Sequence, residues 1–252
     1  MLGKIGQAAK YINNDDSVKG VHPLTDEIKN ILQSKHPAGR EADQEVILEY
    51  TSETPQRVIY ENITEDKVLK IARNMSGSGG PTLIDTDTWK DLLCSKVFGT
   101  NAIELRQAVA DLAKKLCIEE IHPDSLVEYT ANRLIPLDKG PTKDNKPGVR
   151  PIGIGEVLRR IVAKLLIGLI KEDIIQAAGP IQTCAGLKGG IEAAIHAMRK
   201  TWEKPETEAM LLVDAENAFN NVNRKVALEN IKQICPPPSI ATSITHTNNQ
   251  HS

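Results

Sequence analysis

The chain has 252 residues, of which 25% are charged and 3% are aromatic, and its formal net charge is −2. This length suffices for one large domain or two small ones, with a core built mainly from Leu, Ile, Val and Ala. The near-neutral charge excludes a chain that attracts nucleic acid over its whole surface, and the longest apolar stretch, residues 161–170, is too short to span a bilayer.

The first half of the chain predicts short capped helices. Residues 1–22 are polar and are expected to be poorly ordered, and residues 35–56 are expected to form an irregular connector. The predicted helices cover 25–33 with Thr25 as N-cap, Thr64 to about Met75, a segment that starts at Asp85 or Asp87, and 103–117. The glycine-rich run 76–81, SGSGGP, separates two of them.

A β-hairpin is predicted in the middle of the chain. Residues 132–139 and 149–155 form its strands, and the turn signal DNKPG over 144–148 joins them. A long apolar helix over 156–176 follows, until Gly179 and Pro180 end it.

The last third begins with a helix predicted over 191–202. The apolar run that ends at Asp214 then predicts a buried strand over 210–214, although an acid at a strand exit is costly to bury unless a positive group meets it. A helix over 223–234 follows, and the tail 236–252 is expected to be disordered.

Positive charge is concentrated in one band, residues 133–171. Nine Lys or Arg stand against three acids there, a local charge of +6. Such a band is typical of a phosphate-binding surface, and its alternative is a solvated face beside an acidic lobe.

The four cysteines lie far apart and form no CxxC pair, which predicts free thiols in a reducing compartment and argues against a zinc site. We therefore expect an intracellular protein, cytoplasmic or nuclear, with no membrane partner.

Four motifs occur in an order that resembles reverse transcriptases of the non-LTR retrotransposon type. They are RLIPLDK (133–139), VRPIGIGEVLRRIVAKLL (149–166), QTCAGLKGGIEAAIHAMR (182–199) and LLVDAENAFNNVNR (211–224). The stretch GGPTLIDTDTWKDLL (79–93) is similar to the opening motif of that family. The resemblance implies an α+β chain with an incomplete right-hand polymerase fold: helical fingers with a basic hairpin, plus the first palm strand.

The family resemblance also implies roles for individual residues. Asp214 matches the catalytic acid that binds Mg²⁺, and Phe219 matches the aromatic residue that excludes a 2′-hydroxyl. Lys139 and Arg150 match residues that hold the incoming deoxynucleotide triphosphate, and Arg offers phosphate a bidentate fork. RNA template and DNA primer are the implied partners, and the residues expected to contact nucleic acid are Arg159, Arg160, Lys164 and Gln182.

The sequence departs from the family pattern after Asp214. No Asp follows that residue, so the paired aspartates of the second acid motif are missing. We therefore interpret the chain as an amino-terminal fragment that is inactive alone, with an N-terminal extension (1–60), a fingers-like region (61–205), the start of a palm (206–235) and a tail (236–252).

Two alternatives stay open. The chain could be a non-catalytic RNA-binding module derived from such an enzyme, which sequence cannot separate from an inactive fragment. It could also be an unrelated nucleotide-binding enzyme, because GIGEVL (153–158) has two of the three spaced glycines of a dinucleotide loop, with Leu158 at the third position.

Overall fold

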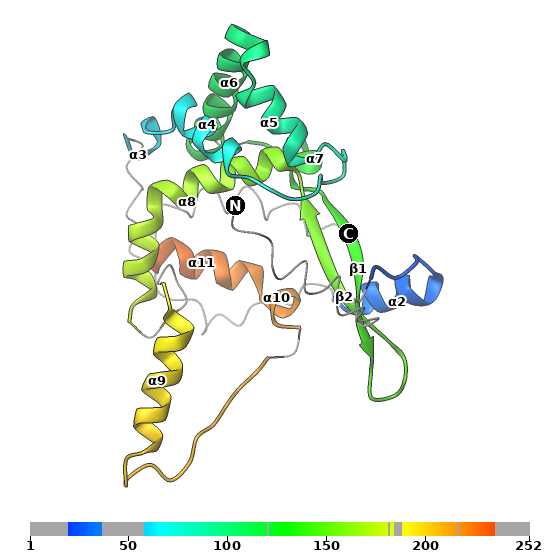
Figure 1. Cartoon of the computed structure of the whole chain (residues 1–252), viewed down its shortest axis with the longest axis vertical. Coiled ribbons are helices and arrows are strands. Elements are labelled where there is room, and N and C mark those ends of the chain that lie inside the picture. The colour runs from blue at the N-terminus through cyan, green and yellow to red at the C-terminus, as the bar shows by residue number, and fades with distance from the viewer. Residues whose placement is uncertain are drawn as a thin grey trace, which may run out of the picture. The chain divides into compact units, whose positions relative to one another are not determined.

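The computed structural model describes residues 20–36, 58–119, 121–180, 182–183, 188–215 and 217–234, which form helices and one two-stranded antiparallel sheet (Figure 1). The α+β class predicted above is therefore confirmed. Two compact units divide the chain: unit 1 comprises Met1–Ala38 and Arg133–Ile154, and unit 2 comprises Gly39–Asn132 and Gly155–Ser252. The segments expected to be disordered or irregular lie mostly outside the described residues, and the predicted domain boundaries stay predictions.

The helical part of unit 2 that precedes the hairpin consists of short helices and one long one. They are α3 (Val58–Glu61), α4 (Glu65–Arg73), α5 (Thr86–Cys94), the 3₁₀ turn η2 (Lys96–Phe98), α6 (Gly99–Ile118), η3 (Pro123–Leu126) and α7 (Val127–Thr130). The helix predicted over 103–117 is thus confirmed, and it begins four residues earlier than the apolar spacing indicated.

Polar side chains begin several helices as the sequence predicts. Thr25 Oγ1 accepts the Ile28 N–H at the start of α2 (Asp26–Ser34), and Thr64 Oγ1 accepts the Lys67 N–H at the start of α4. Of the two acids considered for α5, Asp85 is the N-cap. Hydrogen bonds from the backbone N–H and the hydroxyl of Thr88 hold the pKa of Asp85 below its usual range.

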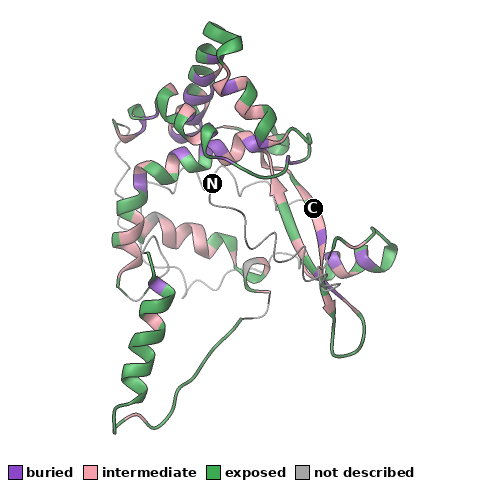
Figure 2. Ribbon diagram, viewed as in Figure 1, coloured by how far each residue is buried: buried purple, intermediate pink, exposed green. Residues whose placement is uncertain are grey.

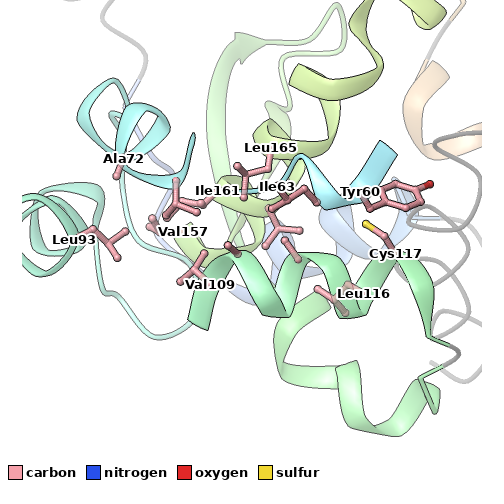
Figure 3. Packing of buried hydrophobic residues seen from close by; sticks show 14 of the residues in the cluster. Tyr60, Ile63, Ala72, Leu93, Val109, Leu116, Cys117, Val157, Ile161 and Leu165 are labelled. Atoms are coloured by element: carbon pink, nitrogen blue, oxygen red, sulfur yellow. The ribbon is translucent and has the colours of Figure 1, made fainter. Parts of the chain in front are cut away.

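The main core of unit 2 lies between α4, α5, α6 and α8 (Val157–Ala178) (Figure 3). Its buried side chains include Ile63, Val68, Leu93, Val109 and Ile161. Side chains of this kind each contribute about 1.5–3 kcal/mol of transfer free energy when buried. The apolar start of α8 therefore belongs to the same core as helices that begin 58 to 92 residues earlier in the chain.

A charged residue also enters this core. Arg106 of α6 is 9% exposed; its Nε donates to Glu65 Oε2 at 2.6 Å, and its Nη1 donates to the Leu93 carbonyl at 2.7 Å. The guanidinium thus links α6 to the first turn of α4 and to the end of α5. Sequence analysis did not single out this residue.

Unit 1 is built on the predicted hairpin, β1 (Asn132–Pro141) and β2 (Pro147–Gly155), with α2 beside it (Figure 1). A small core forms where Ile28 and Leu32 of α2 pack against Val149 of β2. The hairpin prediction is confirmed, and its strands extend slightly further than the sequence signals.

Helix α8 is bent. Its backbone leaves helical geometry at Ile170, with φ −109° and ψ 15°, two residues after Gly168. Gly179, with φ 67°, ends the helix as predicted. Three further helices are described in unit 2: α9 (Gly190–Trp202), α10 (Ala218–Asn221) and α11 (Arg224–Ile234).

Candidate nucleotide and nucleic-acid site

The hairpin of unit 1 carries the two residues expected to hold a triphosphate. Lys139 on β1 and Arg150 on β2 are both exposed, and so are Lys143 and Lys146 in and beside the turn between the strands. Four exposed basic side chains therefore lie on one short hairpin, opposed by two acids, Asp138 and Asp144. The hairpin brings Lys139 and Arg150 into the same structural element, as the resemblance requires.

Local geometry shapes the tip of this hairpin. Thr142 closes the turn, because its N–H donates to the Lys146 carbonyl at 2.8 Å and its hydroxyl accepts the Lys146 N–H at 3.2 Å. Asn145 adopts a left-handed conformation with φ 57°, which Asn tolerates better than most residues. Gly148 is buried against the carbonyl of Gly140, where a Cβ would overlap that oxygen.

A short segment, residues 20–22, pairs with the other edge of β1. Val21 and Leu137 form an antiparallel bridge, the His22 N–H donates to the Pro136 carbonyl, and the Asp138 N–H donates to the Gly20 carbonyl. The expectation that residues 1–22 are poorly ordered is therefore wrong for these three. The reason is that their partner strand lies more than 100 residues away along the chain, beyond the reach of a local pattern.

This pairing occupies an acid that lies next to Lys139. His22 Nε2 lies 3.2 Å from Asp138 Oδ1 and 3.3 Å from the Gly148 carbonyl oxygen, and Asp138 Oδ1 also accepts the Gly140 N–H at 2.6 Å. Because Asp138 is engaged in this way, it competes less with a phosphate for the basic side chains of the hairpin.

Two basic residues of α8 are turned toward the protein. Arg159 and Arg160 are half-buried; Arg159 Nη1 donates to the Thr130 carbonyl at 2.9 Å, and Arg160 Nη2 donates to the Ser78 carbonyl. Burial raises the pKa of Tyr129, beside Arg159, to about 12, although the positive charge of that arginine opposes the rise. Lys164, by contrast, is exposed. Of the three basic residues of α8 expected to contact nucleic acid, only Lys164 is therefore exposed rather than half-buried.

The glycine-rich loop before α5 is anchored to the start of α8. Glu156 accepts the Thr82 N–H at 2.8 Å and the Thr82 hydroxyl at 2.9 Å. Gly80 lies so close that an added Cβ would be 2.7 Å from the Glu156 nitrogen. Sequence analysis missed Glu156 as a positioning residue. The available signal was its place directly before a long helix, together with the distant Gly-Gly-Pro-Thr run over 79–82.

The segment that leads to Asp214 does not form the predicted strand. Residues 207–215 have no regular secondary structure, and Leu211, Leu212 and Val213 are 86%, 76% and 82% exposed. Asp214 is also exposed. The prediction of a buried strand is wrong because a strand needs a neighbour for its backbone hydrogen bonds, and the described residues provide none there.

The remaining predicted site residues lie near this segment or before α9. Phe219 lies in α10, and the side chain of Phe219 is not among the described parts of the structure. The helix follows Asn217, whose φ of 52° is left-handed. Gln182 is exposed. Lys139 and Arg150 belong to unit 1, whereas Asp214, Phe219 and Gln182 belong to unit 2.

The carboxylates of the described residues do not make a two-ion centre. Within the part of the chain that the structure describes, no group of three or more His, Cys, Asp or Glu side chains could hold a metal ion. A pair of divalent ions needs several oxygen ligands held in fixed geometry, so the exposed carboxylate of Asp214 does not by itself fit the Mg²⁺ site that the resemblance implies.

The dinucleotide-loop alternative receives no support from the backbone. Gly153 and Gly155 lie inside β2, whereas a phosphate-binding glycine loop follows a strand and opens a helix.

The sequence matches no family model, and the chain matches no curated protein and no solved structure. In the described ranges, no helix is both long enough and apolar enough to cross a membrane.

Proposed function

We propose that the chain is part of an RNA-directed DNA polymerase of the non-LTR retrotransposon type, contributing the fingers and the first portion of the palm. The observation that supports this best is the exposed basic hairpin. It forms at the residues where the resemblance requires triphosphate-holding strands, and it leads directly into the long helix α8.

In this proposal the hairpin holds the phosphates of an incoming deoxynucleotide. The guanidinium of Arg150 offers two parallel N–H donors to one phosphate group, and the ammonium of Lys139 adds a second positive charge on the neighbouring strand. Both residues are exposed, so a ligand reaches them without displacing core side chains. Asp214 and Phe219 lie in unit 2, and the roles that the resemblance implies for them stay predictions.

The contacts of α8 change the roles that we assign to its basic residues. Arg159 and Arg160 spend donors on the carbonyls of Thr130 and Ser78, so they act as positioning residues for α7 and for the glycine-rich loop. Lys164 is exposed on the same helix and is the α8 residue to which we assign a nucleic-acid backbone contact.

The test is the binding of a deoxynucleotide triphosphate to the whole chain, measured by displacement of a fluorescent triphosphate. Replacing Arg150 with Ala should weaken binding by roughly 10- to 100-fold, since a charge-assisted bidentate contact contributes about 1.5–3 kcal/mol. The matched control is Lys67→Ala, which removes an exposed positive charge from α4 in the other unit. Equal affinity of the Arg150 variant and the wild-type chain would contradict the proposal.

A second candidate is a non-catalytic RNA-binding module, favoured by the four exposed basic residues of the hairpin. RNA affinity should then fall steeply with salt, because each neutralised phosphate releases counterions. Replacing Lys143 and Lys146 with Ala should reduce the slope of log affinity against log salt concentration by about one to two, because one to two phosphate contacts are lost. Strong RNA binding without any triphosphate binding would favour this candidate over the polymerase.

A further inference from the structure

Helix α9 has an apolar stripe that nothing in the described structure covers. The stripe consists of Ile191, Ile195, Met198 and Trp202, which are 63%, 54%, 41% and 53% exposed. Gly190 is the one buried residue described in this helix, and Figure 2 shows α9 exposed along nearly its whole length. Four large apolar side chains on one 13-residue helix are more than the scattered exposed residues of an ordinary surface.

The spacing of the stripe is that of a helix-pairing seam. Steps of four, three and four residues put Ile191 and Met198 at d positions, and Ile195 and Trp202 at a positions, of a heptad repeat. Small or polar residues occupy the remaining face. The pattern therefore matches a helix that packs against one other helix along a narrow contact.

We propose that α9 pairs with α9 of a second copy of this chain, with the two helices antiparallel. Glu192 and Arg199 both occupy e positions, which flank the seam. In an antiparallel pair the e positions of the two helices face each other. Glu192 of each copy then meets Arg199 of the other, so the pair contains two complementary ion pairs related by two-fold symmetry.

A parallel pair lacks this complementarity. Its e positions face g positions, which are Ala194 and Thr201 in this helix and carry no charge. The Arg199 side chain is 78% exposed, and its Nε lies 3.2 Å from Glu203 Oε1, four residues along the chain. Exposed pairs of that kind contribute little, so Arg199 is able to turn toward a partner at small cost.

The contact is short and the association is correspondingly weak. Thirteen residues of helix are about 20 Å long, which is two heptads of seam. The dimer therefore depends on protein concentration, and this dependence is what the experiment measures. The inference stands independently of the proposed function, because it uses no residue of the nucleotide or nucleic-acid site.

The experiment is sedimentation velocity on the full chain over a range of roughly 1–200 µM, which spans weak association. The wild-type chain should shift from monomer to dimer as concentration rises. Glu192→Arg and Arg199→Glu should each weaken the dimer by about tenfold, because each replaces two attractions with two repulsions. An equimolar mixture of the two single variants should restore the dimer. One variant then carries two arginines at these positions and the other two glutamates, so both facing pairs in the mixed dimer are opposite in charge.

Matched controls separate the seam from other causes of association. Lys200→Glu changes the net charge as much as Arg199→Glu but lies off the seam, and it should leave the dimer unchanged. Leu212→Ser alters the exposed apolar segment after α9 and should also leave it unchanged. A monomer at all concentrations, failure of the mixed variants to pair, or a dimer lost in Leu212→Ser alone would each overturn the proposal.

Discussion

Arg106 carries a full positive charge into the space between α4, α5 and α6. A buried charge is tolerated when an opposite charge and good hydrogen-bond acceptors surround it, and Glu65 and the Leu93 carbonyl meet both needs. The side chain of Arg106 thus joins α6 to α4 and α5 by hydrogen bonds, at a place in the core where an apolar side chain could have packed. The role of this arginine is structural, although its residue type would suggest phosphate binding.

Replacing Arg106 with Met should destabilise the chain by about 2–4 kcal/mol, because Glu65 and a buried carbonyl lose their partner. Thermal or urea unfolding measures the change. The double variant with Glu65→Gln should lose less than the sum of the single losses, since the two residues interact directly. Lys115→Met, at an exposed position of the same helix, should shift stability by less than about 0.5 kcal/mol; a similar loss in both would show that Arg106 has no special role.

Three acidic groups in and beside the core predict how stability depends on alkaline pH. Burial raises the pKa of Cys117 to about 12. Burial also raises the pKa of Tyr60 to about 12, and the nearby Cys117 adds a smaller contribution. The pKa of Tyr129 is likewise raised by burial to about 12. The unfolded chain releases these protons near pH 9 to 10, whereas the folded chain keeps them. The contribution of these three groups to stability should therefore be constant below about pH 8 and should fall as the pH rises toward 12.

Urea unfolding at about pH 7, 9 and 10.5 tests this pH dependence. The midpoint should be lowest at the highest pH, and Tyr60→Phe should make the decline shallower because Phe has no proton to release. A midpoint that does not change across this range would contradict the assignment of these groups to the core.

At the scale of elements, the contact between the glycine-rich loop and the start of α8 joins parts of the chain that lie 74 residues apart. Gly80 makes this contact possible, because its Cα lies against the backbone of Gly155 and Glu156. The loop therefore acts as a rigid connector in unit 2, despite a composition that is typical of flexible linkers.

Gly80→Ala should lower the unfolding temperature, because its Cβ would be 2.7–2.9 Å from backbone atoms that cannot easily move. Gly168→Ala is the matched control. It lies in α8, where an added Cβ would meet no atom within 4 Å, so it should be neutral or should stabilise the helix by up to about 1 kcal/mol. Differential scanning calorimetry compares the two, and equal unfolding temperatures would contradict the described packing of the loop.

The elements that sequence predicts well are those whose signals are local. Thr25, Thr64 and Asp85 begin helices because a cap depends on residues three positions away, and the turn before Gly148 forms within its own few residues. The failures all involve distant partners. Residues 20–22 are ordered through β1, and the run before Asp214 stays irregular without a neighbouring strand among the described residues.

The candidate site shows the same limit. The turn and strand patterns correctly placed Lys139 and Arg150 on one hairpin, and both residues are exposed. Residue type does not reveal that Arg159 and Arg160 donate to carbonyls, or that Glu156 anchors a loop, because those contacts depend on which segments meet in space.

At the scale of the whole molecule, the 252-residue chain should not extend a primer with Mg²⁺ or Mn²⁺. Two-ion catalysis needs carboxylates from more than one motif, and no Asp follows Asp214 in these residues. A primer-extension assay on an RNA template measures this directly. Template-dependent synthesis that disappears in Asp214→Ala, but persists in the exposed-acid control Asp91→Ala, would contradict the prediction.

The pairing of residues 20–22 with β1 has a consequence for synthesis of the chain on the ribosome. His22 meets Gly148 across 126 residues, so the first segment of unit 1 emerges long before its partner exists. At about 5–20 residues per second, it waits roughly 6–25 s. Ile28 and Leu32 are exposed to solvent or to chaperones during that interval. Translation rate through the intervening segment is therefore expected to influence the yield of folded protein.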